Sequence, residues 1–283
     1  MKNVFVEYAD YNDISNFHLL HEKQILENAV TSISVDPYMG DTILLGFSGN
    51  EVEIFSTRTG KILNSFDKLS ESTSRIIFSE FLSSAHTEDD IYEILIISSN
   101  GESRVLSFNT DTKSLTVISQ KKLGNDLVQS VMHPMGNLVF SITENGRNWN
   151  LFDLENNEIL YKSNACTTML TSLNMHPDGH MLAFGDSEGE VSILEITSNE
   201  EAARFKTKVG KVRGIDFSEN GYHMLVYGEA QGLEIWDLRN SDEVHKEIAL
   251  EGQIKEACFD NSGRYLLAAD KNLHLFDTKK FNN

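Results

Sequence analysis

Hydrophobic and polar residues alternate through much of the chain in runs of five or six positions, the pattern expected of strands with one buried face. The clearest runs cover residues 212–217, 222–227 and 233–237, and a weaker run follows around 247–250. Short turns that contain glycine or polar residues separate these runs. The pattern therefore predicts four consecutive antiparallel strands in this part of the chain.

The same order of strands and turns recurs along the sequence. A turn that ends in glycine separates the first and second strands of each unit, and four such turns end at Gly136, Gly179, Gly221 and Gly263. Their glycines are 43, 42 and 42 residues apart, and another copy ends at Gly40. A period of this size is typical of proteins in which one supersecondary unit is copied and stacked.

Six units are visible, and the second of them lacks the turn glycine. They begin near Val30, Arg75, Val128, Leu170, Val212 and Ile254. Four antiparallel strands in a unit of this length form the blade of a β-propeller, in which radial stacking covers faces and edges that a lone sheet would expose. We expect one all-β propeller domain over residues 1–283. Residues 1–29 would supply ring-closing strands, with residues 16–24 completing the last blade.

Composition restricts the classes of partner. The 283 residues carry a net charge of −19, which argues against direct nucleic-acid binding and favours basic segments of partner proteins. The two cysteines have no Cys-x-x-Cys spacing, which fits a reducing intracellular compartment, and Cys258 is predicted to be buried. There is no apolar run long enough to span a bilayer and no signal peptide, so we expect no membrane association.

Few residues suggest chemistry. His133 and His176 precede prolines at matching repeat positions, so we interpret them as turn residues, and no histidines have the spacing of a zinc site. Residues 46–49 (GFSG) lack the spacing of a nucleophile motif and fall where a blade needs a turn. We therefore expect no catalytic residues, cofactor or metal. A pair of channel carboxylates, as in glycosidase propellers, stays open as an alternative.

Surface recognition is the remaining class of function. The first strand of each blade lines the channel of a propeller, and its ends present side chains on one face, where arginine and tyrosine are favoured contact residues. The candidate partner-binding residues are Arg75, Gln129, Arg213 and Lys255, with Tyr227 at the end of a second strand. Trp149 and Trp236 align with Leu233 and Phe152 of other units, so we expect both tryptophans in blade cores.

The residues also carry a family resemblance. A turn glycine followed by a strand ending at residues 235–238 (IWDL) resembles the WD40 repeat, and residues 152–154 (FDL) and 276–277 (FD) resemble weaker copies of this ending. The Gly-His pair that usually precedes the first strand is absent from every unit, and the usual turn aspartate appears at Asp186, with Glu229 in another copy. The resemblance implies a WD40-type propeller of four-stranded antiparallel blades. Seven blades are favoured, with six as the alternative.

Within that family, residues 176–276 most resemble the pre-mRNA-processing factor nineteen family of spliceosome-associated U-box ubiquitin ligases. The resemblance rests on residues 176–179 (HPDG), 217–222 (FSENGY), 235–239 (IWDLR) and 259–263 (FDNSG). It implies a nuclear, non-catalytic docking domain for spliceosome subunits and ubiquitination substrates, including an RNA-binding splicing factor. Ubiquitin-ligase activity and oligomerisation would lie in regions outside this chain. A scaffold of another intracellular complex and an enzymatic propeller with a carboxylate site are the alternatives.

Overall fold

The computed structural model describes residues 2–8, 17–24, 29–36, 40–66, 74–82, 91–240 and 242–280. The chain divides into two compact units, residues 1–127 and 128–283, and each is described by itself. No helix in these described ranges is long and apolar enough to cross a membrane.

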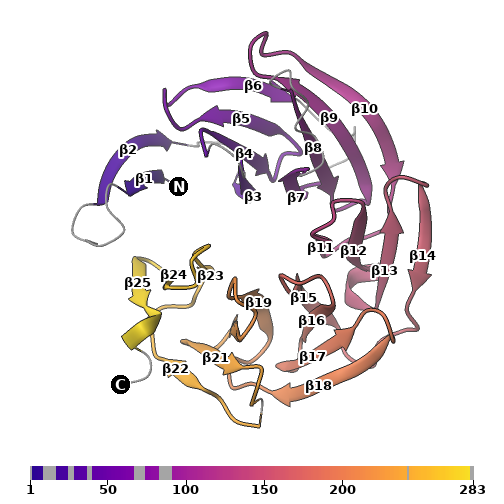
Figure 1. Cartoon of the computed structure of the whole chain (residues 1–283), viewed down its shortest axis with the longest axis vertical. Coiled ribbons are helices and arrows are strands. Elements are labelled where there is room, and N and C mark those ends of the chain that lie inside the picture. Colours follow the sequence, from indigo (N-terminus) through magenta and orange to yellow (C-terminus); the bar gives the residue numbers. More distant parts are fainter. Residues whose placement is uncertain are drawn as a thin grey trace. The chain divides into compact units, whose positions relative to one another are not determined.

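The first unit contains three antiparallel sheets, coloured indigo to magenta in Figure 1. A two-stranded sheet pairs β1 (Lys2–Tyr8) with β2 (Phe17–Gln24). The next sheet contains β3 (Val30–Val35), β4 (Thr42–Phe47), β5 (Val52–Ser56) and β6 (Ile62–Phe66). The third contains β7 (Ile76–Phe81), β8 (Ile91–Ser98), β9 (Glu102–Asn109) and β10 (Leu115–Lys122).

The second unit contains four antiparallel sheets. The first two contain β11 (Gln129–Met132), β12 (Leu138–Thr143), β13 (Asn148–Asp153) and β14 (Glu158–Lys162), then β15 (Leu170–Met175), β16 (Met181–Asp186), β17 (Glu190–Glu195) and β18 (Glu200–Lys206). The last two contain β19 (Val212–Phe217), β20 (His223–Gly228), β21 (Leu233–Asp237) and β22 (Lys246–Ile248), then β23 (Glu256–Phe259), β24 (Tyr265–Ala269) and β25 (Leu273–Asp277). Two short 3-10 helices, η2 (Glu144–Gly146) and η3 (Thr278–Lys280), complete the described elements of this unit.

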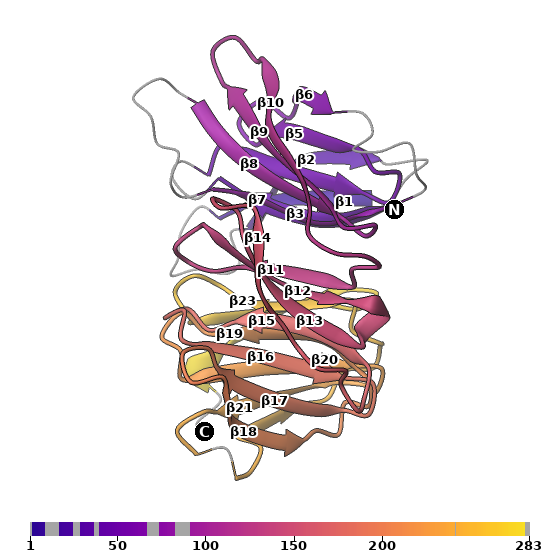
Figure 2. The ribbon, with the colours of Figure 1, turned by 90° about the vertical axis from the view of Figure 1, so that its right-hand side faces the viewer.

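The strands follow their sequence order within every blade sheet, so each strand pairs with its neighbour in the chain. In the second unit, β11, β15, β19 and β23 lie at the inner ends of their sheets, and β14, β18 and β22 lie at the outer ends (Figure 1). Figure 2 shows the sheet β15–β18 next to the sheet β11–β14, as does Figure 1. This strand order, with the inner strands of successive sheets in contact, is that of propeller blades.

The number of blades is the main correction to the sequence-based expectation. Within the described ranges, six sheets have the blade order, five with four strands and one with three. The preference for seven blades, which came from the family resemblance, is therefore wrong, and the six repeats counted in the sequence are the six sheets. β2 pairs with β1 in the structure. Completion of the last blade by residues 16–24 therefore stays a prediction. The assignment of residues 1–283 to a single propeller domain also stays a prediction.

The repeated glycine turns take the predicted conformation. Gly136, Gly179, Gly221 and Gly263 have φ angles of 81°, 76°, 71° and 65°. Residues with a Cβ atom rarely adopt this left-handed region, so glycine keeps the turn between the first and second strands tight. Each of these turns needs glycine at the same position, and this explains why the repeat is visible in the sequence.

His133 and His176 are turn residues, as predicted, and each also joins its blade to the next one. Nε2 of His133 donates a hydrogen bond to the carbonyl oxygen of Gly179 over 3.0 Å, and Nε2 of His176 does the same to Gly221 over 3.0 Å. Because a carbonyl can only accept, Nε2 carries the proton in both rings. The matching positions of these histidines therefore reflect one inter-blade hydrogen bond used twice.

The core lies between successive sheets. Trp236 is 3% exposed and stacks on Phe205 of β18 with ring centroids 4.1 Å apart, which confirms its place in a blade core. Trp149 is half-buried and packs against the cluster around Phe140 and Phe184. The prediction for Cys258 is wrong: Ala257 is the buried residue of β23, and Cys258 is exposed.

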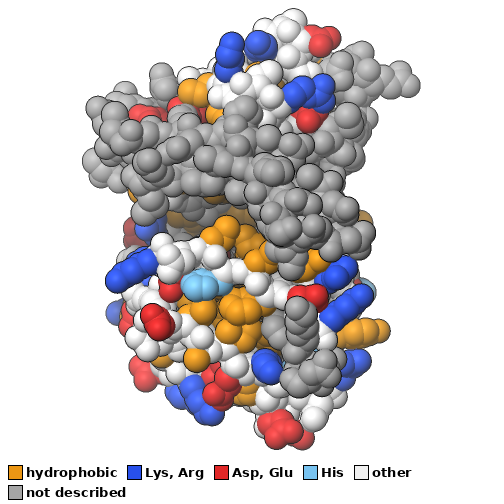
Figure 3. Space-filling model, turned by 90° about the vertical axis from the view of Figure 1, so that its left-hand side faces the viewer, with side chains coloured by type: hydrophobic (Ala, Val, Ile, Leu, Met, Phe, Trp, Pro, Cys, Tyr) orange, Lys and Arg blue, Asp and Glu red, His pale blue; other side chains and the backbone are white. Residues whose placement is uncertain are grey.

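The three-stranded sheet leaves apolar surface at its outer strand. Figure 3 views the chain from the side of β25 and shows hydrophobic side chains gathered in the lower half of the view. Leu273 of β25 is 63% exposed, while Leu275 and Phe276 are half-buried. Among the residues that the structure describes, β25 has no fourth strand of its sheet beside it, and Leu273 is exposed there.

A candidate protein-docking surface on the second unit

Several polar side chains of the inner strands hold neighbouring blades together. Oε1 of Gln129 accepts the backbone N–H of Leu173 over 3.1 Å. In the next pair of blades, the hydroxyl of Thr171 donates to the carbonyl of Val212 over 2.6 Å. Gln129, one of the five predicted contact residues, is therefore half-buried and already engaged in the fold.

Tyr227 has a similar place. Its side chain is 3% exposed, and its hydroxyl donates to Oε1 of Glu256 on the next blade over 2.6 Å. Gly214 makes room for the ring, because a Cβ atom there would lie 2.2 Å from the Tyr227 hydroxyl. The structure thus shows Tyr227 as an inter-blade contact with almost no surface to offer a partner.

Asp216 joins three blades through one carboxylate. It accepts the backbone N–H of Phe259 over 2.7 Å and the side-chain amide of Asn174 over 3.2 Å. Burial raises the pKa of Asp216 to about 6, and it also raises the pKa of Glu256. Both carboxylates belong to inner strands, and both accept structural hydrogen bonds.

The three predicted contact residues with basic side chains are exposed. Arg75 lies just before β7 in the first unit, and Arg213 and Lys255 lie in the second. Arg213 is 37% exposed, and its guanidinium lies 3.6 Å from Oε1 of Glu229. Arg75, Arg213 and Lys255 therefore stay predictions as partner-binding residues.

A pocket of about 210 Å³ lies where the sheets β11–β14 and β15–β18 meet. It is lined by residues of β13, β15, β16, β17, β18 and the segment that connects β14 to β15. The lining residues are Trp149, Cys166, Thr167, Thr168, Leu170, Phe184, Asp186, Glu190, Ser192, Ile193, Leu194, Glu201 and Arg204. We call this site the acidic pocket.

Aromatic rings form the apolar part of the acidic pocket. The indole of Trp149 lies 5.4 Å from the ring of Phe184 and 4.8 Å from that of Tyr161, measured between centroids. These ring contacts hold the indole in place, and the half-buried Trp149 side chain contributes to the lining. The arrangement places an indole and a phenyl ring in the lining of the pocket.

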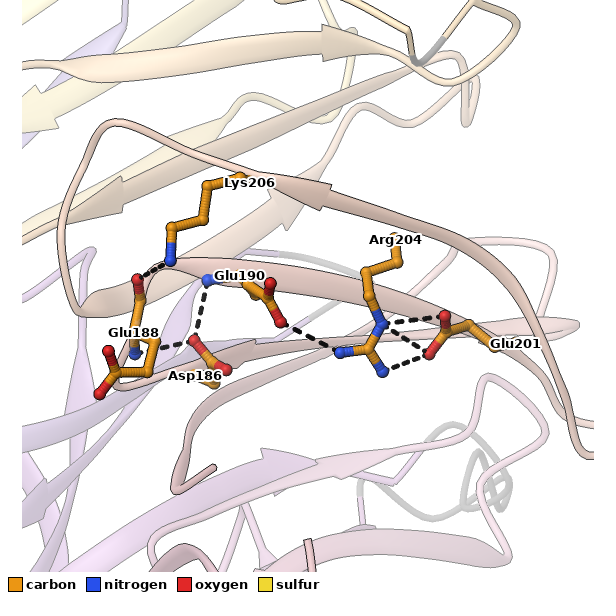
Figure 4. Close-up of polar contacts among 6 residues, drawn as sticks. All are labelled: Asp186, Glu188, Glu190, Glu201, Arg204 and Lys206. Carbon is orange, nitrogen blue, oxygen red and sulfur yellow. Dashed lines mark hydrogen bonds and ion pairs between the residues drawn. The ribbon is translucent and has the colours of Figure 1, made fainter. Parts of the chain in front are cut away.

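Charged residues form the polar part of the acidic pocket (Figure 4). Arg204 donates to both oxygens of Glu201 through Nε, at 2.9 and 3.1 Å, and its Nη1 lies 3.1 Å from Oε2 of Glu190. The hydrogen bond from Arg204 lowers the pKa of Glu201. Arg204 is 50% exposed, so each of these exposed pairs contributes only about 0.2–1 kcal/mol.

Asp186 differs from this exposed group because it is only 4% exposed. Its Oδ1 accepts the backbone N–H groups of Glu188 and Glu190 over 2.9 and 2.8 Å, which fixes the turn between β16 and β17. The predicted place of Asp186 in a turn is confirmed. Its place in the pocket was missed, because Trp149 and Asp186 belong to different repeats.

A second pocket, of about 180 Å³, lies between the sheets that contain β20 and β24. His223 and His245 line it with ring centroids 5.4 Å apart, and Lys279 is the one lysine in the lining. Burial lowers the pKa of His223. In the part of the chain that the structure describes, no group of three or more His, Cys, Asp or Glu residues could hold a metal ion.

Comparison with known proteins supports the WD40 resemblance. The WD40 domain of anaphase-promoting complex subunit 4 matches residues 161–220 as a family model. Pre-mRNA-processing factor 19 homolog 2 of Arabidopsis thaliana is 30% identical over 149 residues, which cover 52% of this chain and 28% of that protein. Pre-mRNA-processing factor 19 of Dictyostelium discoideum is 25% identical over 258 residues, which cover 88% of this chain and 49% of that protein.

Pre-mRNA-processing factor 19 of Schizosaccharomyces pombe is 33% identical over 102 residues, which cover 36% of this chain and 21% of that protein. The chain thus spans about half the length, or less, of the curated relatives it matches. Both resemblances drawn from the sequence are confirmed: the chain forms WD40-like propeller blades and is similar to pre-mRNA-processing factor 19.

Proposed function

We propose that the chain is a non-catalytic, protein-docking propeller of a nuclear pre-mRNA-splicing assembly, and that it binds partners or substrates for a ubiquitin ligase complex. Its partners would be spliceosome subunits and ubiquitination substrates, including an RNA-binding splicing factor. The observation that carries the proposal is the alignment of 88% of the chain with a pre-mRNA-processing factor 19, together with six sheets of blade order.

The charge of the chain supports proteins as the direct partners. A net charge of −19 repels a phosphate backbone and attracts basic polypeptide segments. The side chains of Gln129 and Asp216 on inner strands and of Tyr227 on a second strand hold blades together, whereas Arg213 and Lys255 are exposed. Docking would therefore use exposed side chains at the ends of the inner strands and the pockets between blades.

A scaffold of a different intracellular complex is the second candidate. It is favoured by the match of residues 161–220 to the WD40 domain model of anaphase-promoting complex subunit 4. The two candidates share the docking mechanism and differ in the proteins that are bound, so the identity of the recovered partners separates them.

Affinity purification from nuclear extract tests the proposal. The immobilised chain, residues 1–283, is incubated with nuclease-treated extract at low salt, and bound proteins are identified by mass spectrometry. We expect several splicing proteins, and we expect fewer with Arg213→Glu, which reverses an exposed charge without disturbing the core. Recovery of no splicing protein would contradict the proposal. Recovery of subunits of one other complex would favour the second candidate.

A further inference from the structure

We propose that the acidic pocket receives one basic side chain, lysine or arginine, from a partner polypeptide. This inference rests on the proposed docking function and names the chemistry of one contact. The pocket measures about 210 Å³, which is below the range of about 300–1,000 Å³ typical of sites for drug-sized ligands. Its size therefore suits a single side chain.

The aromatic part of the pocket matches the stem and the charge of such a side chain. Indole rings attract cations more strongly than other aromatic side chains do, and the Trp149 indole is held in place by Tyr161 and Phe184. Lysine and arginine carry apolar stems that pack on such surfaces while the charged end reaches polar groups.

The charge of the lining selects a cation. Three carboxylates, those of Asp186, Glu190 and Glu201, face one guanidinium, that of Arg204, so the lining has a net charge of −2. Arg204 is bound by both Glu190 and Glu201, so it is not available for an incoming anion (Figure 4). A phosphate or carboxylate ligand would meet unbalanced negative charge.

Asp186 supplies an independent reason. Its Oδ1 is occupied by two backbone N–H groups, whereas Oδ2 has no hydrogen-bond partner among the residues that the structure describes. Figure 4 shows this second oxygen on the side where Glu190 and Arg204 lie. Asp186 as a residue is only 4% exposed, and its unpartnered Oδ2 is still reachable, so a charged donor that binds this oxygen stabilises the carboxylate.

The lysine ammonium or arginine guanidinium would therefore donate to Oδ2 of Asp186 and to the carboxylate of Glu190, with its stem on Trp149. Arg204 can keep its contacts with Glu201 in this arrangement, because Nε and Nη2 both bond to that carboxylate. Because these ion pairs of Arg204 are exposed and weak, the side chain can also move without disturbing the blade.

Capped peptides of sequence Gly-Gly-X-Gly-Gly are the probes, with X as lysine, acetyl-lysine, norleucine or glutamate. Binding is followed by NMR through the indole N–H signals of the two tryptophans. Trp236 is 3% exposed and acts as an internal reference. We expect the lysine peptide to shift the Trp149 signal saturably, and the other three peptides to shift it at least about tenfold less at equal concentration, since they lack the charged donor.

Matched variants assign the contact. Asp186→Asn keeps an oxygen for the two backbone N–H groups and removes the charge, and Glu190→Gln removes the charge at the pocket rim. Each is expected to weaken binding of the lysine peptide about tenfold. Glu188→Gln removes the same charge from the same turn, outside the lining, and is expected to leave binding unchanged. A change in the indole signal of the buried Trp236 would show that Asp186→Asn does not fold. In that case Glu190→Gln alone tests the contact.

The inference is overturned if the lysine peptide produces no saturable shift of the Trp149 signal, or if norleucine or glutamate peptides bind equally well. It is also overturned if Glu188→Gln weakens binding as much as Glu190→Gln. These outcomes are independent of the purification from nuclear extract. Splicing proteins recovered equally by the chain and by Glu190→Gln would leave the docking function standing while removing the acidic pocket from it.

Discussion

The hydrogen bond from His176 to the next blade gives a prediction whose magnitude follows from its contacts. The side chain of His176 is 7% exposed, donates to the carbonyl of Gly221, and lies edge-on to Phe217 with centroids 5.2 Å apart. Removing the ring by His176→Ala leaves a buried carbonyl unpaired, at about 1–3 kcal/mol. The lost aromatic contact adds about 0.5–1.5 kcal/mol. We therefore expect the free energy of unfolding to fall by about 1.5–4.5 kcal/mol.

Urea unfolding followed by tryptophan fluorescence measures this loss, because both tryptophans, Trp149 and Trp236, lie in the second unit. His133→Ala should cost less than His176→Ala, because His133 is half-buried. His180→Ala, an exposed residue next to the same turn, is the control and should change stability by less than about 0.5 kcal/mol.

A double-mutant cycle with Gly221 tests the geometry itself. A Cβ atom on Gly221 would lie 2.4 Å from Cε1 and Nε2 of His176, and its φ of 71° adds about 1–2 kcal/mol of backbone strain. Gly221→Ala should therefore be severe alone and milder in the His176→Ala background, with a coupling of at least about 1 kcal/mol. Additive losses, or a cost of His176→Ala below that of His180→Ala, would refute the reasoning.

Three further predictions concern other sites. Burial raises the pKa of Glu80 from 4.5 to about 7, so the folded chain holds a proton that the unfolded chain loses, and stability falls as pH rises between these values. Glu80→Gln should remove this fall, so that its free energy of unfolding exceeds that of the original chain by up to about 3 kcal/mol at pH 8. Unfolding followed by circular dichroism measures both pH profiles, and equal profiles would contradict this prediction. Gly214→Ala should cost about 1–3 kcal/mol because its Cβ would meet the ring of Tyr227, and Tyr227→Leu in the same chain should recover part of the loss in urea unfolding. Arg213→Glu should have a thermal unfolding midpoint within a few degrees of that of the original chain, because the contact of Arg213 with Glu229 is exposed. A large drop in the midpoint would show that Arg213 has a structural role.

The blade strands could be predicted because two local rules agree along the chain. Alternation of apolar residues predicts which residues pair into sheets, and the turn glycines fix where each hairpin reverses. The strand predicted at 212–217 is β19 (Val212–Phe217), and the strand predicted at 233–237 is β21 (Leu233–Asp237). The fourth strand, expected at 247–250, is β22 (Lys246–Ile248), where the apolar signal is weakest.

The errors arose where a local pattern does not determine the answer. The seventh blade was taken from the family resemblance, although the chain itself contains six repeats. Cys258 was placed in the core because it was taken to alternate inward beside Ala257, but a strand of four residues gives too few positions to fix which face is buried. A shift of one residue exchanges the two faces of a strand, which is what happened here.

The site residues were harder to predict for a different reason. A polar side chain on a first or second strand of a blade can point to solvent or bind the next blade, and the partner then belongs to the following repeat. Gln129 and the N–H of Leu173 are 44 residues apart, and Tyr227 and Glu256 are 29 apart. Spacing within one repeat cannot distinguish these two outcomes, so Gln129 and Tyr227 were predicted as contacts although both hold blades together.

The acidic pocket shows what a repeat alignment can still reveal. Where Trp149 stands in its strand, the aligned unit has Leu233, so only one of these two units places an indole at the boundary between blades. The next unit along the chain supplies Asp186 in the turn that faces this boundary, with Glu190 after it. An aromatic ring from one repeat and the carboxylate of a buried residue from the following repeat are each common features alone. Because stacking brings the third strand of one blade against the following blade, their combination at adjacent repeats is the signal that identifies this site, and aligned positions of neighbouring repeats should be compared in pairs.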